Sequence, residues 1–185
     1  MIINRRKLLA AAIGASVLAG MTPRQVQAQV KGNYRTLQWE DLLPDGWNPR
    51  AAMAGIDTRS IAEGSAQEME MLRKMRKIWD NAPVRPDLDG QQIRLAGYVV
   101  PLELSSGAIR EFLLVPYFGA CIHSPPPPAN QIVMVKLQKA IRIRTMDACW
   151  VAGIMNTQHN NTDSGVSGYF LAGHHIDEYR GPRKP

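Results

Sequence analysis

The chain has 185 residues, a length that suggests one domain, with or without appendages. Its 22 basic and 16 acidic residues give a net charge of +6, but four of the basic residues precede residue 29, in a stretch without acidic residues. Residues 29–185 therefore hold 18 basic and 16 acidic residues, a net charge of +2. This small excess argues against a nucleic-acid partner selected by charge.

Residues 1–28 have the three parts of an export signal: basic residues 4–7, apolar residues 8–19, and small or tolerated residues around a cut after Ala28. The apolar run is about a dozen residues, whereas a bilayer span needs about 20. We therefore expect a soluble periplasmic protein that does not span the membrane once the signal is removed. The pair Arg5-Arg6 leaves the twin-arginine route open beside ordinary secretion.

Residues 29–90 are predicted to form a helical arm and a linker. A short helix over residues 36–43 would begin at Thr36 and end before Pro44, with Trp39 packing the arm onto the domain. A longer helix follows the capping box Ser65-x-x-Glu68 and carries an apolar stripe of methionines. We expect this stripe to cover a sheet, and an ion pair of Glu70 with Lys74 to lie on the other side.

Residues 91–180 change to strand patterns, and residues 181–185 are a tail. Five apolar runs predict strands, near residues 93–102, 112–115, 132–137, 149–155 and 169–176. Gly97 and Gly153 predict bulges or sharp bends, and residues 156–164 a polar loop. The predicted fold class is mainly β with an N-terminal helical arm. We expect a small five-stranded barrel resembling the oligonucleotide/oligosaccharide-binding (OB) fold, with a small β-sandwich as the alternative.

The chemistry-bearing residues gather before four prolines, in the sequence ACIHSPPPP. In an extended segment Cys121 and His123 face the same side and could together bind zinc or copper. Glu103 is a candidate third ligand. The same pair could instead form a reactive thiol. A structural turn is the third interpretation, since Gly119 permits an unusual backbone angle and the prolines favour an extended segment.

The second cysteine, Cys149, leaves further alternatives open. An exported protein can form disulfides, and Cys121 with Cys149 would close a loop of about 28 residues, worth roughly 3–4 kcal/mol in the chain-entropy model. A buried free thiol that packs like a small hydrophobe is the other alternative. The sequence contains no Cys-x-x-Cys, Gly-x-Ser-x-Gly or phosphate-binding loop, so it has no strong enzyme signature.

Several stretches resemble an uncharacterised bacterial family of exported proteins and lipoproteins, known only as a domain of unknown function. They are GYVVPLE (97–103), EFLLVPYFGACIHSPPPPANQIV (111–133), WVAG (150–153) and GYFLAGHHIDEY (168–179). The resemblance covers about residues 34–180 and carries no established activity. The association of its members with zinc export or uptake loci implies a link to metal handling.

Position by position, the resemblance carries over the Cys-x-His pair of Cys121 and His123, the glutamate at Glu103, and the pair Asn130-Gln131. Ser124 and Cys149 depart from the family's pattern. We therefore expect a non-enzymatic accessory or binding module linked to zinc handling. The alternatives are an interaction module of an envelope transport assembly without its own ligand and, third, a Cys/His thiol enzyme.

Overall fold

The computed structural model describes residues 32–48, 51, 62, 64–103, 107–120 and 126–181. The chain divides into two compact units, Met1–Val30 and Lys31–Pro185, and the described residues all belong to the second. The expected export signal therefore lies outside the described residues and stays a prediction. Among the described residues, no helix combines the length and apolarity needed to cross a bilayer.

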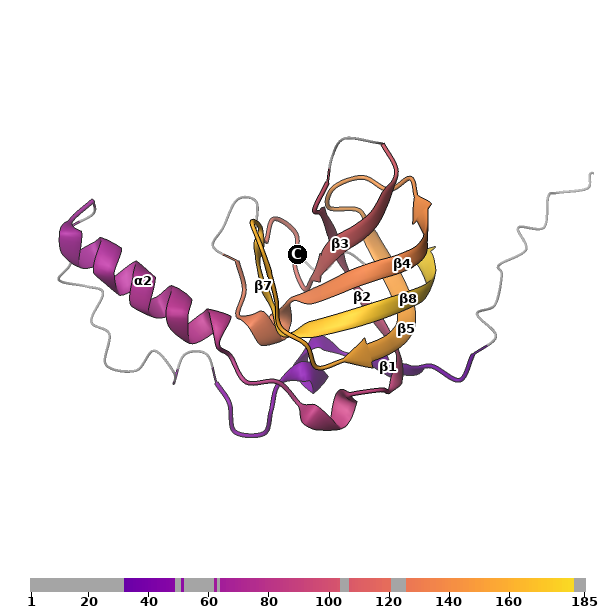
Figure 1. Ribbon diagram of the computed structural model, residues 1–185, viewed down its shortest axis with the longest axis horizontal. Helices are drawn as coiled ribbons and strands as arrows, with labels where there is room; N and C mark the ends of the chain where they lie inside the picture. Colours follow the sequence, from indigo (N-terminus) through magenta and orange to yellow (C-terminus); the bar gives the residue numbers. More distant parts are fainter. Residues whose placement is uncertain are drawn as a thin grey trace, which may run out of the picture. The chain divides into compact units, whose positions relative to one another are not determined.

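A closed five-stranded barrel forms the body of the described unit (Figure 1). Its strands are β2 (Gln92–Pro101), β3 (Ile109–Val115), β4 (Val133–Ile141), β5 (Ala148–Asn156) and β8 (Tyr169–Glu178). The order is β2-β3-β4-β8-β5, and β5 pairs with β2 to close the ring. Pairing is antiparallel except between β4 and β8, which run parallel. The predicted mainly β, OB-like barrel is confirmed, and the sandwich alternative is wrong.

Strand alternation creates two apolar clusters on opposite faces of the barrel wall. Phe112 and Leu114 belong to the large interior core, whereas Leu113 and Val115 belong to a second, smaller cluster. That second cluster also holds Ala120 and Ile132, which flank the proline segment. Ala120 and Ile132, on the connection from β3 to β4, therefore pack on the outer face of β3.

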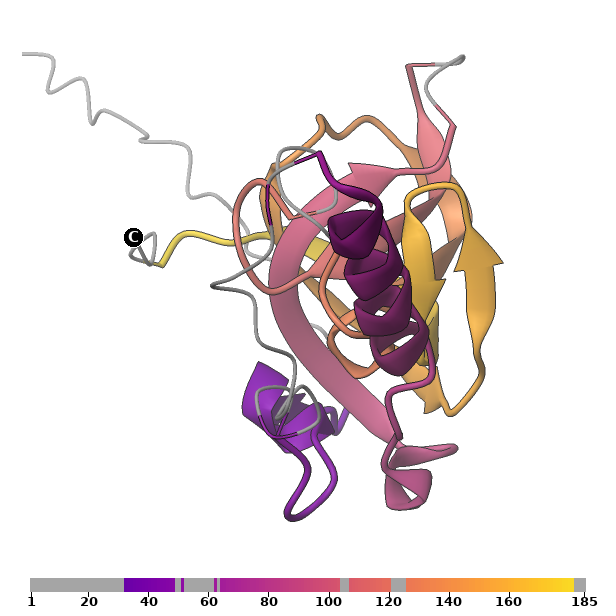
Figure 2. The same ribbon diagram turned by 90° about the vertical axis from the view of Figure 1, so that its left-hand side faces the viewer.

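The wall is curved, and a close approach between two of its strands leaves room only for glycine. Figure 2 shows β2 as a strongly curved ribbon, and this strand pairs with β3, β5 and β1. The register of β5 against β8 shifts between Ala152 and Gly153, as the sequence predicts for a bulge. An alanine Cβ at Gly153 would lie 2.1 Å from the Ala172 carbonyl oxygen, so a side chain has no room there.

The N-terminal arm differs from the predicted helix over residues 36–43. The structure has strand β1 (Arg35–Leu37), parallel to β2, followed by the 3-10 helix η1 (Trp39–Leu42). Thr36 therefore lies in a strand instead of capping a helix. The physical reason is burial: Leu37 lies opposite Leu95 and is 1% exposed, so pairing with the barrel outweighs the local capping signal.

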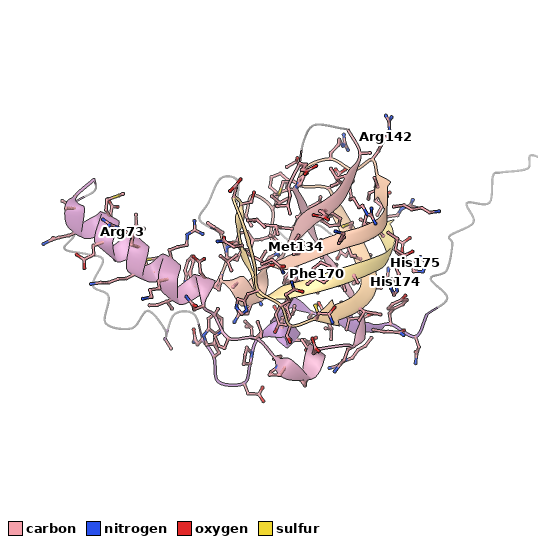
Figure 3. The ribbon with its side chains drawn as sticks, viewed as in Figure 1. Arg73, Met134, Arg142, Phe170, His174 and His175 are labelled. Atoms are coloured by element: carbon pink, nitrogen blue, oxygen red, sulfur yellow. The ribbon has the colours of Figure 1, made fainter. Side chains whose placement is uncertain are left out.

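The long helix α2 (Ala66–Asp80) begins as predicted. Ser65 Oγ accepts a hydrogen bond from the Glu68 amide at 3.1 Å, and Lys74 pairs with Glu70 at 2.9 Å. However, the helix has no fully buried residue: within the predicted stripe Leu72 is 43% exposed, and Met71, Met75, Ile78 and Trp79 are half-buried. The stripe is thus partly covered, and that it covers the sheet stays a prediction. Arg73, labelled in Figure 3, lies on the same helix.

A hairpin replaces the predicted polar loop over residues 156–164. Strands β6 (Asn160–Thr162) and β7 (Gly165–Ser167) pair with each other antiparallel. The Thr162 hydroxyl donates to the Gly165 carbonyl at 2.7 Å and so closes the turn. The turn therefore depends on a polar side chain, which an apolar strand pattern does not reveal. Two further 3-10 turns, η2 (Pro86–Leu88) and η3 (Ala129–Gln131), complete the described elements.

Candidate functional site

The predicted metal ligands are only partly within the described residues. Cys121 and His123 lie outside them, while Glu103 follows β2 and is exposed. Within the described ranges, no three His, Cys, Asp or Glu side chains gather closely enough to hold a metal ion. A site built on the Cys-x-His pair with Glu103 stays a prediction.

Cys149 is a core residue. It is a free cysteine, 1% exposed, within the interior cluster of the barrel. Burial raises the pKa of its thiol to about 12, with a further contribution from the Asp147 carboxylate. The structure therefore confirms the buried free thiol as the state of Cys149, and the disulfide alternative is wrong. A thiol with such a pKa is protonated at neutral pH and does not act as a nucleophile.

We expect Cys149 to resist alkylation in the folded protein. In a Cys121→Ser variant treated with iodoacetamide at neutral pH, mass spectrometry should find no adduct under native conditions and one adduct after denaturation, because only unfolding exposes and ionises the Cys149 thiol. Rapid labelling of the native variant would contradict the buried position of this residue.

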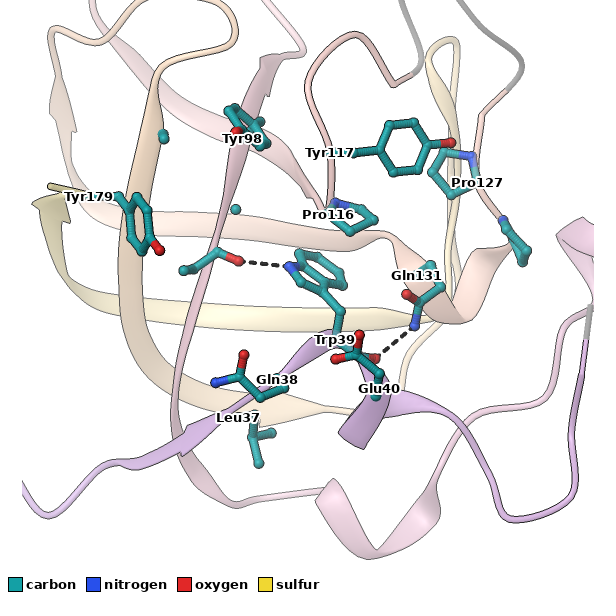
Figure 4. A pocket seen from close by; sticks show the side chains of 14 residues that line it. Leu37, Gln38, Trp39, Glu40, Tyr98, Pro116, Tyr117, Pro127, Gln131 and Tyr179 are labelled. Carbon is teal, nitrogen blue, oxygen red and sulfur yellow. Dashed lines mark hydrogen bonds between the residues drawn. The ribbon is translucent and has the colours of Figure 1, made fainter. Parts of the chain in front are cut away.

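The described residues line a pocket of about 390 Å³ on the barrel wall (Figure 4). Residues 37–40 of the arm and residues 96–98 of β2 form its floor and one side. Pro116 and Tyr117 follow β3, and Pro127, Pro128 and Gln131 precede β4. Ala148 and Tyr179 complete the lining at the ends of β5 and β8. We call this the Trp39 pocket, after the residue at its centre.

Trp39 is fixed in place by hydrogen bonds from both sides. Its indole Nε1 donates to the Ala96 carbonyl at 2.7 Å, and Gln131 Nε2 donates to the Trp39 carbonyl at 2.9 Å (Figure 4). Below the ring lies Gly97, where an alanine Cβ would be 3.0 Å from Trp39 Cζ2 and 2.7 Å from Leu114 Cγ. Glycine at this position lets the indole approach the strand closely.

Both flanks of the ACIHSPPPP segment contribute residues to the pocket. Tyr117 comes before residues 121–125 and Gln131 comes after them. The second flank is anchored by Asn130, which is fully buried and donates from Nδ2 to the Pro83 carbonyl at 2.9 Å. On the first flank, Gly119 adopts a φ of +85°, in agreement with the unusual backbone angle predicted for it.

Sequence reasoning found two of the pocket's residues and missed its aromatic lining. Gln131 was singled out by the family resemblance, and Trp39 was predicted only to pack the arm. Tyr98, Tyr117 and Tyr179 come from segments far apart in the chain, and no spacing signal links them. All three lie within the stretches that resemble the family, and this was the one sequence signal that could have pointed to them.

The adjacent histidines on β8 do not form a metal site. His174 Nδ1 lies 3.0 Å from the Tyr34 hydroxyl and forms a hydrogen bond with it, while His175 is exposed (Figure 3). Both rings also pack edge-on against the Tyr34 ring, with centroids 6.3 Å apart. They therefore hold the start of the arm against β8.

Comparison with known proteins gives a family and a related structure. The family model described as "Protein of unknown function (DUF3299)" matches residues 39–178. The crystal structure of a DUF3299 family protein from Pseudomonas aeruginosa is similar to this chain, with 35% sequence identity and a TM-score of 0.64. That similarity covers 82% of this chain and 99% of the other. The search of curated proteins found no match.

Proposed function

Because the chain belongs to the DUF3299 family of proteins of unknown function, we propose its function from its own geometry: it is a non-enzymatic binding module that takes a ligand in the Trp39 pocket. The observation that carries this proposal is the pocket itself, open on the barrel wall and lined by aromatic rings and prolines. The match to the family model confirms the predicted membership of a family of unknown function.

The lining favours binding over catalysis. A volume of about 390 Å³ falls within the range of small-molecule sites, which are mostly apolar with a few placed polar groups. Among the described lining residues there is no Cys, His, Ser or Lys, and Glu40 is the one carboxylate. These residues provide no Cys, Ser or Lys nucleophile, whereas they do provide an aromatic surface.

Filling the pocket tests this proposal. Ala148 lines the pocket, so an Ala148→Leu variant should occupy part of its space, while an Ala140→Leu variant adds the same bulk at an exposed position of β4 outside the lining. In a ligand-observed NMR screen of soluble aromatic fragments, hits should bind the wild-type protein and the Ala140→Leu control. Their affinity should fall about tenfold or more in Ala148→Leu. Hits that bind both variants equally would place the binding site elsewhere.

We also propose, as a second function, a link to zinc handling through Cys121, His123 and Glu103. Its support is the Cys-x-His spacing and the exposed Glu103 carboxylate after β2. We expect Cys121→Ser and His123→Ala each to lower the zinc affinity of the purified protein by about tenfold or more, measured with a competing chelator dye. Glu103→Gln should lower it less, because a carboxylate is the weakest of the three ligands for zinc.

The matched control for this experiment is His159→Ala. His159 is exposed in the segment before β6 and lies outside the proposed ligand set, so its removal should leave zinc affinity unchanged. Equal zinc affinity in the wild type, Cys121→Ser and His123→Ala would eliminate the metal proposal. The pocket proposal is tested separately, by the fragment screen with Ala148→Leu.

The alternative interaction module has one observation in its favour. Phe118 is 68% exposed beside the pocket, next to Tyr117 at 46%, and packs edge-on against the Tyr98 ring at 5.9 Å. Exposed aromatic residues are enriched at protein interfaces. If the exported protein works in an envelope transport assembly, a photo-crosslinking residue at position 118 should capture one envelope partner in cells. The same residue at Asp163 in the β6–β7 turn should not.

A further inference from the structure

We infer that the Trp39 pocket recognises an organic cation, a ligand with an ammonium or guanidinium head that lies against the aromatic rings. This inference rests on the proposed function, because it names the ligand class for the same pocket. Its basis is the charge, the hydrogen-bonding groups and the ring surfaces that the described lining offers.

The described lining carries one negative charge and no positive one. Glu40 is the one charged side chain among the described lining residues, which include no Lys, Arg or His. The Glu40 side chain is exposed beside Trp39 and makes no ion pair with the described residues (Figure 4). An anionic ligand would meet this carboxylate at close range, whereas a cation would pair with it.

Two side-chain hydrogen-bond donors of the described lining are used within the protein. The Trp39 indole N–H is taken by the Ala96 carbonyl, and the Gln131 amide group donates to the carbonyls of Trp39 and Asn130. Gln131 Oε1 accepts no hydrogen bond from the described residues, so this oxygen and the Glu40 carboxylate are acceptors of the lining. The three lining prolines have no backbone N–H to offer. A ligand with N–H donors suits these acceptors.

The aromatic rings of the lining also favour a cationic ligand. Trp39, Tyr98, Tyr117 and Tyr179 all line the pocket, and the face of each ring carries partial negative charge. A cation over such a face is attracted to it. The barrel already contains one example outside the lining: the Arg94 guanidinium lies 4.3 Å from the centroid of the Trp150 ring, which in turn packs against Tyr179.

A matched trio of probes separates charge from shape. Benzylamine is a cation with N–H donors, benzyltrimethylammonium is a cation without them, and benzyl alcohol is neutral with a similar body. We expect both cations to shift the amide resonances of the pocket in NMR titrations and to bind about fivefold or more tighter than benzyl alcohol. Benzylamine should lose about fivefold in affinity in a Glu40→Gln variant, because the carboxylate is its ionic partner.

The control variant is Asp163→Asn, which removes an exposed carboxylate from the β6–β7 turn and should leave all three affinities unchanged. Equal binding of benzylamine and benzyl alcohol, no binding of either cation, or no effect of Glu40→Gln would overturn the cation inference. If the alcohol binds as well as the amine and Ala148→Leu removes both, the pocket remains the binding site and only its ligand class is wrong. If neither binds and the fragment screen finds no pocket ligand, the proposed function fails as well.

Discussion

A Gly153→Ala variant is expected to lose about 3 kcal/mol or more of the free energy of unfolding, because the added methyl group has no space. Its Cβ would lie 2.1 Å from the Ala172 carbonyl oxygen and 2.8 Å from the Ala172 carbonyl carbon. Both atoms are backbone within β8, the strand paired with β5 at the bulge, so neither can move aside without breaking the ladder. Chemical denaturation monitored by circular dichroism measures the loss.

Gly46→Ala is the control for this substitution. Gly46 has a φ of +75°, and no atom lies within 4 Å of the position its Cβ would take. The variant therefore carries only the strain of a left-handed residue, about 1–2 kcal/mol. If Gly153→Ala proves no more destabilising than Gly46→Ala, the close approach of β5 and β8 at the bulge is wrong.

Tyr169→Phe is expected to cost about 2–4 kcal/mol, since it leaves two backbone groups without their partner. The buried Tyr169 hydroxyl donates to the Leu42 carbonyl at 2.6 Å and accepts from the Arg85 amide at 2.8 Å. Through these bonds β8 holds η1, the element that carries Trp39 and Glu40. Thermal unfolding should show the loss of stability, and the affinity of pocket ligands should fall with it.

Tyr34→Phe provides the matched comparison. It removes the hydroxyl that hydrogen-bonds to His174 in a half-buried setting, where water can replace the lost partner. We expect a cost of under about 1 kcal/mol and unchanged ligand affinity. If Tyr169→Phe were as mild as Tyr34→Phe in both measurements, the Tyr169 hydroxyl would not secure the arm that builds the pocket.

The five barrel strands could be predicted because each has an apolar run long enough to stand out. The start of α2 could be predicted because Ser65 and Glu68 form a local signal that long-range packing does not change. The β6–β7 hairpin escaped prediction because polar side chains close it. The packing on the outer face of β3 was not predicted either. Ala120 and Ile132 pack on that face, and the methionine stripe of α2 does not.

The candidate site was less predictable than the fold. The Cys-x-His pair was visible because its two residues are close in sequence, but it lies outside the described residues. The Trp39 pocket combines the arm, β2, both flanks of the proline segment and the ends of β5 and β8. Such a site depends on how the barrel closes, and no local spacing encodes it.

The most direct test of the pocket as the binding site is an NMR chemical-shift map of the protein with a hit from the fragment screen. Two side-chain reporters lie within the site: the Trp39 indole N–H and the Gln131 amide group. We predict that the largest shifts fall on these two signals and on the Gly97 amide. Largest shifts on β6 and β7 or on α2, with the Trp39 and Gln131 signals unmoved, would contradict the proposal that this pocket is where the protein binds its ligand.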